Sequence, residues 1–347
     1  MAKKTSTQRI PSPYSVSIRE VAKQAGVSVA SVSRVINNSG HVSEKLQQRI
    51  QAAIQQLNYI PNSAARALIT RQTRIIGALI PSIAHSIYAT FIEALQQRLN
   101  GAGYSLVIAI AGYDRKYEYE EARQLILAGA EALMLPGEMH NPALYRLLQA
   151  RNIPYVLNSI FHPDSPHPCV GYDNKGAALR TTNYLLDLGH RRIATITGYC
   201  DKIDRFAERV DGIRESLQKR GCELPDSWIL QRDFSIAEGR EAFRYLMTQP
   251  TRPTAIVCGN DVLALGALFE AQRLGVQVPE EVSITGFDDL EWAAQMTPSL
   301  TTVHIPLATM GIRVADYLLG RLRGEAVPHA TRIEVDLVLR ESTGPCR

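Results

Sequence analysis

Residues 17–37 constrain this chain more than any other segment, because their pattern predicts two short helices joined by a tight turn. Ser17 and Glu20 have the spacing of a capping box, in which two side chains satisfy free backbone N–H groups at a helix start. Gly26 permits the turn that follows, and Ser28 can cap a second helix. Apolar residues at helical spacing form a small core: Ile18, Val21, Ala22, Ala25, Val27, Val32 and Val35. The segment is therefore predicted to be a helix-turn-helix.

The second predicted helix has a solvent-facing stripe of Val29, Ala30, Ser33 and Arg34. Small side chains allow close approach to a partner and one arginine projects from them, which suits the major groove of DNA. Helical hairpins also occur as plain structural elements, but charge separates the two interpretations. Residues 1–75 contain eleven Lys and Arg against two Glu, a net charge of +9, so the rest of this +4 chain carries −5. A basic headpiece on an acidic body favours nucleic-acid binding.

The 347-residue chain exceeds one ordinary domain, and its 45% hydrophobic content is ample for a buried core. No apolar run approaches the ~20 residues that span a bilayer, and the polar first residues lack the hydrophobic core of a signal peptide. We therefore expect a cytoplasmic protein with no membrane partner. Five widely spaced cysteines show no CxxC pair, so we expect reduced thiols: Cys169, Cys200, Cys222, Cys258 and Cys346.

Two further helical patterns follow the hairpin. Ser43 opens an amphipathic stretch that ends near Pro61 and would complete a small headpiece. Residues 62–71 begin with a capping asparagine and contain good helix formers, but too little apolar surface to fold alone. Because a helix this short is marginal in water, the run taken alone can equally be an ordinary linker.

From Arg74 onward, apolar runs typical of strands alternate with amphipathic runs typical of helices. Strands are predicted at 75–80, 104–110, 132–135, 155–158, 192–197, 255–258, 282–287 and 333–340, with helices at 87–100 and 117–128. This alternation predicts parallel sheets covered on both faces. Parallel sheets bind ligands at the carboxyl ends of their strands, where this chain carries polar residues: Ser82, Asn158, Asp173, Asn260, Asp261, Asp288 and Asp289. A ligand cleft is expected.

Several motifs follow one another in a fixed order from residue 16 to the end. The headpiece contains Ser-x-x-x-Val-Ala-x-x-Ala-Gly-Val-Ser from Ser17, then Val-Ser-Arg-Val-Ile-Asn at 32–37 and Leu-Asn-Tyr-Ile-Pro-Asn at 57–62. The body contains Leu-Gly-His-Arg-Arg-Ile-Ala at 188–194, Asn-Asp at 260–261, Gly-Phe-Asp-Asp at 286–289 and Pro-Ser-Leu-Thr-Thr-Val at 298–303. In this combination the chain resembles the lactose/galactose repressor (LacI/GalR) family.

The resemblance implies a transcriptional regulator with an all-α helix-turn-helix headpiece and an α/β core. The core would have two Rossmann-like subdomains joined by three crossovers, as in periplasmic (type I) sugar-binding proteins. The expected parts are a disordered basic arm (1–15), the DNA-binding domain (16–61), a hinge helix or linker (62–73) and the core (74–347). Within the core we expect an N-subdomain of about 74–173 and 304–332, and a C-subdomain of about 174–303 and 333–347.

The resemblance also implies how DNA is bound. Val29, Ala30 and Arg34 match base-facing positions, where an arginine can donate two bonds to guanine and small apolar side chains suit thymine methyl groups. Leu68 matches a leucine that relatives wedge into the minor groove, so residues 62–73 would be a hinge helix that folds on DNA and kinks it. The predicted DNA-binding residues are Ser28, Val29, Ala30, Ser33, Arg34, Asn37, Asn62, Ala65, Arg66, Leu68 and Ile69.

In the core, Arg209, Asn260 and Asp288 match effector-binding positions of the family, with Ser82, Tyr88 and Asp173 as weaker candidates. Their amide, carboxylate and guanidinium groups suit a hydroxylated effector such as a sugar, sugar acid or polyol. The other interpretation of Asp288 is a helix cap after a strand. Residues 198–205 depart from the family pattern, so the resemblance does not place Arg205.

The resemblance leads us to expect a repressor that binds a pseudo-palindromic operator as a homodimer, without a cofactor. The tail at 341–347 carries no heptad leucines for further association.

His162, Asp164, His167 and Cys169 are metal-ligating residue types close together, but their spacing matches no zinc pattern. No nucleophile or acid–base pair stands at convincing spacing, so we expect no enzyme. The alternative is a carbohydrate-binding or sugar-modifying protein with an incidental headpiece.

Overall fold

The computed structural model describes residues 16–36, 42–61, 67, 72–83 and 86–347. The chain forms two compact units, residues 1–73 and 74–347, and each is described by itself. Several expected features lie outside the described residues: the arm at 1–15, most of the hinge segment, and the predicted DNA-binding residues Asn37, Asn62, Ala65, Arg66, Leu68 and Ile69. Within the described ranges, no helix is long and apolar enough to cross a membrane.

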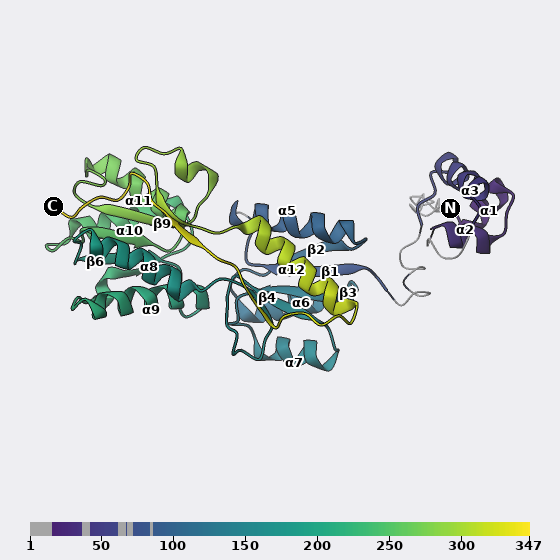
Figure 1. Ribbon diagram of the computed structural model, residues 1–347, viewed down its shortest axis with the longest axis horizontal. Helices are drawn as coiled ribbons and strands as arrows, with labels where there is room; N and C mark the ends of the chain where they lie inside the picture. The colour runs from purple at the N-terminus through teal and green to yellow at the C-terminus, as the bar shows by residue number, and fades with distance from the viewer. Residues whose placement is uncertain (1–15, 37–41, 62–66, 68–71, 84–85) are drawn as a thin grey trace, which may run out of the picture. The chain divides into compact units, whose positions relative to one another are not determined.

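The first unit contains the predicted helix-turn-helix, with helices α1 (Ile18–Ala25), α2 (Val29–Ile36) and α3 (Glu44–Gln56) (Figure 1). The capping box forms as predicted, because Ser17 and Glu20 bind each other's backbone N–H groups. Gly26 ends α1 at φ 61°, a left-handed conformation that glycine adopts without steric cost. The helices bury a small core: Val21, Ala22, Ala25, Val32, Ile50 and Ala53.

The second unit contains two six-stranded sheets. The first sheet is parallel throughout, in the order β11-β5-β4-β3-β1-β2. Its strands are β1 (Ile75–Ile80), β2 (Ser105–Ile110), β3 (Ala130–Pro136), β4 (Tyr155–Asn158), β5 (Cys169–Gly171) and β11 (Ala330–Arg332). Helices α5 (Ser86–Gly101) and α12 (Leu307–Leu322) cover one face, and α6 (Arg115–Leu127) and α7 (Pro142–Ala150) cover the other.

The second sheet has the order β12-β10-β9-β8-β6-β7 and is parallel except for the antiparallel pair β10–β12. Its strands are β6 (Ile193–Thr197), β7 (Ile229–Gln231), β8 (Ala255–Cys258), β9 (Ser283–Asp288), β10 (Thr301–His304) and β12 (Asp336–Val338). Helices α8 (Asn174–Asp187) and α9 (Asp204–Lys219) pack on one face, and α10 (Ile236–Thr248) and α11 (Asp261–Leu274) on the other. Short 3₁₀ turns occupy Asp226–Trp228 and Glu291–Ala294.

The chain passes between the two sheets three times: after β5, between β10 and α12, and between β11 and β12. Apolar residues of these crossings join the buried core of the first sheet, among them Tyr172, Ile305 and Ile333. The two sheets are therefore linked by several packed segments, and their strand ends meet at the junction where a ligand can be enclosed.

One predicted element was wrong. The alternating apolar pattern at 333–340 indicated a single strand, yet β12 covers only Asp336–Val338. Ile333 and Val335 are buried in the crossing segment instead, each 6% exposed. Alternation is a property of any extended chain with one buried side, and only packing decides whether such a segment pairs with a sheet. No strand was predicted at β5, β7, β10 or β11, each of three or four residues.

Candidate functional site

Helix α2 presents the predicted DNA-contacting residues to solvent. Val29 is 40% exposed, Ala30 and Arg34 are exposed, and Ser33 is half-buried. On the opposite side of the helix Val32 is fully buried, so the orientation of α2 is fixed by the headpiece core. The hydroxyl of Ser28 accepts a hydrogen bond from the backbone N–H of Ser31 at 3.1 Å, which caps the start of the helix as predicted.

The core unit contains a cavity of about 50 Å³ at the junction of the two sheets. Its walls come from both halves of the core, because α5 and the loops after β2, β4 and β5 contribute on one side and α9, α11 and β9 on the other. The lining residues are Ile87, Tyr88, Tyr113, Ser159, Tyr172, Arg205, Phe206, Arg209, Phe234, Asn260, Val262 and Asp288.

Arg209 is held rigidly in the cavity wall. Its Nε donates to Asn174 at 3.0 Å, Nη1 to the carbonyl of Gly259 at 2.5 Å, and Nη2 to the hydroxyl of Tyr172 at 3.3 Å. Its guanidinium also lies 3.5 Å from the ring centre of Phe287, a cation–π contact. Burial lowers the pKa of Arg209, and the three bonds and the ring offset part of that cost. The side chain is therefore a fixed positive group.

Asp288 is the last residue of β9 and is 3% exposed. No hydrogen bond to its carboxyl group occurs among the described residues. Burial, and then the nearby Asp261, raise the pKa of Asp288 well above its usual value, while Arg209 lowers it. The backbone of Asp288 has φ 123°, a conformation that side-chain-bearing residues rarely adopt. A buried carboxyl group on a strained backbone, with no hydrogen-bond partner among the described residues, is a candidate ligand contact in the cavity wall.

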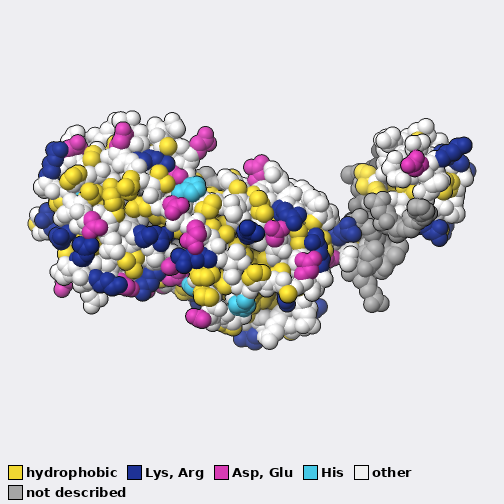
Figure 2. Space-filling model, viewed as in Figure 1, with side chains coloured by type: hydrophobic (Ala, Val, Ile, Leu, Met, Phe, Trp, Pro, Cys, Tyr) yellow, Lys and Arg dark blue, Asp and Glu magenta, His cyan; other side chains and the backbone are white. Residues whose placement is uncertain are grey.

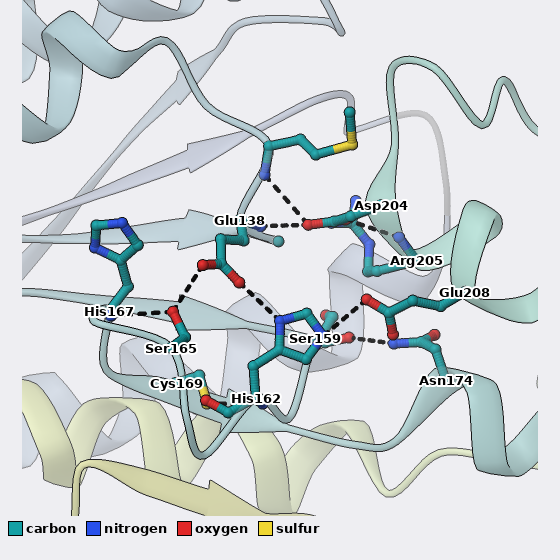
Figure 3. A network of polar contacts seen from close by, with 12 residues as sticks. Glu138, Ser159, His162, Ser165, His167, Cys169, Asn174, Asp204, Arg205 and Glu208 are labelled. Atoms are coloured by element: carbon teal, nitrogen blue, oxygen red, sulfur yellow. Dashed lines mark hydrogen bonds and ion pairs between the residues drawn. The ribbon is translucent and has the colours of Figure 1, made fainter.

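Asn260 and Arg205 complete the polar wall. The side-chain oxygen of Asn260 accepts the N–H of Leu263 at 2.8 Å and caps α11. Arg205, 9% exposed, donates through Nη1 to Asp204 at 3.0 Å. Asp204 in turn accepts the backbone N–H groups of Glu138 and Met139, so this pair ties α9 to the loop after β3 (Figure 3).

Four of the six predicted effector residues line the cavity: Tyr88, Arg209, Asn260 and Asp288. Ser82 is not among the lining residues, and Asp173 accepts the N–H of Gly176 at 2.7 Å as the cap of α8. The prediction missed the aromatic wall of Tyr113, Phe206 and Phe234, which has no local sequence signature. It also left Arg205 unplaced, although this residue lies in the first turn of α9, about one turn before Arg209.

One of the residues at 162–169 that are of metal-ligating type, although no metal site was predicted there, has a different role in the structure. His162 lies between two carboxylates, with Nδ1 2.7 Å from Glu138 and Nε2 2.8 Å from Glu208 (Figure 3). Ser165 also donates to Glu138, at 2.7 Å. Within the described ranges, no three His, Cys, Asp or Glu side chains are placed to hold a metal ion.

Comparison with known proteins decides the family. Residues 17–62 match the family described as bacterial regulatory proteins, lacI family, and residues 182–343 match a periplasmic binding protein-like domain. Over 337 residues the chain is 33% identical to the HTH-type transcriptional repressor PurR of Escherichia coli O139:H28, a match that covers 95% of this chain and 98% of that protein. The chain belongs to the LacI family of bacterial regulatory proteins.

Solved structures of the LacI family agree with the fold. The Lac repressor dimer bound to operator and the anti-inducer ONPF has a TM-score of 0.86 and 26% identity, covering 95% of this chain and 99% of that chain. The transcriptional regulator CelR in complex with cellobiose has a TM-score of 0.70 and 29% identity, covering 94% and 99%. These findings confirm the predicted family and fold, and with them the prediction of a DNA-binding transcriptional regulator.

Proposed function

We propose that this LacI-family regulator represses transcription as a homodimer bound to a pseudo-palindromic operator, and that a small hydroxylated effector in the core cavity controls its affinity for DNA. The observation that carries the proposal concerns Asp288. Its buried carboxyl group faces the cavity and accepts no hydrogen bond from any residue that the structure describes. A sugar, sugar acid or polyol supplies the hydroxyl donors that such a group requires. We place the regulator in the cytoplasm, with its DNA.

In the headpiece, we propose that α2 enters the major groove, where Arg34 binds guanine and Val29 and Ala30 contact bases through apolar atoms. One headpiece contacts few base pairs, and the two-fold symmetry of a dimer doubles these contacts. The Lac repressor dimer on its operator and the repressor PurR support this proposal. In the core, the CelR complex with cellobiose supports a carbohydrate-like effector.

We assign no catalytic step to the chain, and the alternative is a carbohydrate-binding or sugar-modifying protein with an incidental headpiece. Selection of bound sequences from random duplex DNA separates the two. A regulator enriches one pseudo-palindromic sequence, whereas the alternative protein enriches none.

Sedimentation at micromolar concentration tests the dimer, and a stable tetramer independent of DNA would contradict it. A thermal-shift screen of sugars, sugar acids, polyols and nucleobases tests the effector, because a ligand that binds the folded state stabilises it.

A further inference from the structure

Arg205 has hydrogen-bonding capacity that the described residues leave unused. It is 9% exposed and lines the cavity, yet its side chain makes one hydrogen bond to a described residue, from Nη1 to Asp204. Neither Nε nor Nη2 donates to a described residue. These two atoms form one edge of the planar guanidinium group, and two parallel N–H donors on one edge match the two oxygens of a carboxylate.

The second arginine of the cavity has no such free edge. Each of the three nitrogens of the Arg209 guanidinium already donates to a protein oxygen. Arg209 is therefore a structural cation that adds positive potential to the cavity. Among the described residues, Arg205 is the cavity arginine whose Nε and Nη2 both lack a protein acceptor, whereas Nε and Nη2 of Arg209 donate to Asn174 and Tyr172.

The balance of charge in the cavity wall favours an anionic ligand. The charged side chains of the lining are Arg205, Arg209 and Asp288, and Asp204 pairs with Arg205 from outside the lining. Burial favours the neutral form of Asp288, so among the described residues one positive charge is left without a counterion at the cavity. A single carboxylate neutralises that charge, whereas a phosphate dianion would leave a new excess of negative charge.

The rest of the wall suits a short hydroxylated carbon chain. Phe234 contacts the ring of Tyr113 edge-on at 5.9 Å between centres and that of Phe206 at 5.0 Å, so apolar faces line one side. Asp288 and Asn260 stand among the other lining residues, where they can bind hydroxyl groups.

We propose that the effector is a hydroxy acid of the aldonate or uronate class, whose carboxylate binds Nε and Nη2 of Arg205 and whose hydroxyl groups bind Asp288 and Asn260. This inference rests on the proposed function, because it identifies the ligand of the same cavity. It assigns to Arg205 the role of selecting acids over neutral sugars.

The test is calorimetric titration of the full chain with pairs of compounds that differ in charge. The pairs are D-gluconate with D-sorbitol, D-galactonate with galactitol, and D-glucuronate with D-glucose. D-glucose 6-phosphate is titrated as well, to test a phosphate in place of the carboxylate. We expect at least one acid to bind about 100-fold more tightly than its neutral partner. Tighter binding of a neutral compound, tighter binding of the phosphate, or binding of none of the acids would each overturn the proposal.

Variants of Arg205 test the assigned contact. We expect Arg205→Gln to weaken binding of the acid by about 100-fold and Arg205→Lys by about tenfold, because lysine keeps the charge and loses the two-pronged geometry. Arg214→Gln is the matched control, since Arg214 lies on the same helix and pairs with Asp226 at the surface. Removal of Arg205 leaves Asp204 unpaired, so the double variant Asp204→Asn with Arg205→Gln is measured as well. Recovery of acid binding in that double variant would contradict the contact.

Operator binding, measured on DNA selected from a random pool, separates this proposal from the proposed function. If a neutral sugar binds and changes the affinity for DNA, the proposed function is supported and the proposal of an acidic effector is wrong. If an acid binds through Arg205 but the affinity for DNA does not change, the acid site is supported and the proposal that the effector controls DNA binding is wrong.

Discussion

The imidazole of His162 lies 2.8 Å from the carboxylate of Glu208, a residue 46 positions away on α9 (Figure 3). The other ring nitrogen lies 2.7 Å from Glu138, which follows β3 in the first sheet. A neutral imidazole has one N–H, so donation to both carboxylates requires the protonated ring. The hydrogen bond to Glu208 raises the pKa of His162 to about 9, against the opposing effect of burial. The protonated His162 therefore links the two halves of the core through its hydrogen bonds to Glu138 and Glu208.

The pH dependence of stability should reveal this proton. Because the pKa of His162 is raised from 6.5 to about 9, its contribution is fully present below pH 6.5 and is lost as the pH rises through 9. The groups that face it are Glu138, Glu208 and, through Glu138, His167. We expect the free energy of unfolding to fall by about 1–2 kcal/mol between pH 6.5 and 9.5, after allowance for partial exposure.

His162→Gln should flatten this decline in urea unfolding measured across the same pH range. His304→Gln is the control, because His304 contacts a single carboxylate, Asp289, at 2.9 Å. An NMR titration of the His162 ring gives the direct check. A pKa near 6.5 for that ring in the folded protein would rule out the protonated bridge.

Gly137 tests the contact between the loop after β3 and α9. Its φ is 77°, and an added Cβ would overlap the side chains of Arg205 and Asp204. Gly112 has a similar φ of 61° but no atom within 4 Å of an added Cβ. Both alanine variants incur the cost of the left-handed backbone, about 1–2 kcal/mol. We expect Gly137→Ala to cost a further ~1–3 kcal/mol by overpacking, and equal unfolding free energies for the two variants would show that the contact is not tight.

Arg34 tests DNA recognition by α2. Arg34→Ala should weaken binding to the selected operator by about 1–3 kcal/mol and reduce discrimination against scrambled DNA, since it removes two bonds to one base. Lys45→Ala removes another cation of the headpiece, from α3. This variant should weaken binding to the operator and to scrambled DNA by the same factor. Competition binding measures both variants. If Arg34→Ala binds the operator as tightly as the parent, α2 does not read the base assigned to it.

Leu68 tests the proposed hinge. Leu68→Ala should lower operator affinity and reduce the bend of the DNA, because a smaller side chain unstacks the central base step less. Ligand binding by the core should stay unchanged. Bend angles from fluorescence energy transfer on end-labelled operator provide the measurement, and an unchanged angle would exclude the wedge.

Asp288 tests effector coupling. Asp288→Asn removes the buried ionisable group and keeps its shape, and asparagine tolerates positive φ. We expect the variant to match or exceed the parent in thermal stability at pH 8, since the pKa of Asp288 is raised by burial. Asp288→Ala also removes the hydrogen-bonding group. The operator affinity of this alanine variant without ligand should stay near parental, while the ligand-dependent change, typically about 1–3 kcal/mol, should disappear. A full ligand response in this variant would place the effector elsewhere.

The core and the headpiece differ in how charge is arranged. Over the face of the core in Figure 2, acidic and basic side chains are interspersed. The excess of positive charge is concentrated in residues 1–75. Attraction to DNA is therefore expected to depend strongly on salt and to act through the headpiece.

The sequence by itself determined the features that depend on near neighbours. The capping box of Ser17 and Glu20, the turn at Gly26 and the exposed stripe of α2 each involve residues within one or two helical turns, so their hydrogen bonds and burial follow from local spacing. The alternation of strands and helices likewise follows from hydrophobic period. Ordered motifs along the chain were enough to predict the family, and with it the positions of Arg209 and Asp288.

Tertiary structure alone decided how the cavity and the bridge between the halves are assembled. Tyr113, Arg205 and Phe234 meet in one wall, and His162 meets Glu208, although nothing in the local sequence of these residues indicates a partner. Asp173 follows β5 of the first sheet and Asp288 ends β9 of the second. Although both lie near the end of a strand, Asp173 caps a helix and Asp288 faces the cavity. The physical reason is that contacts between distant residues depend on how two sheets pack and where the crossings run, and a hydrophobic period specifies burial without specifying the neighbour.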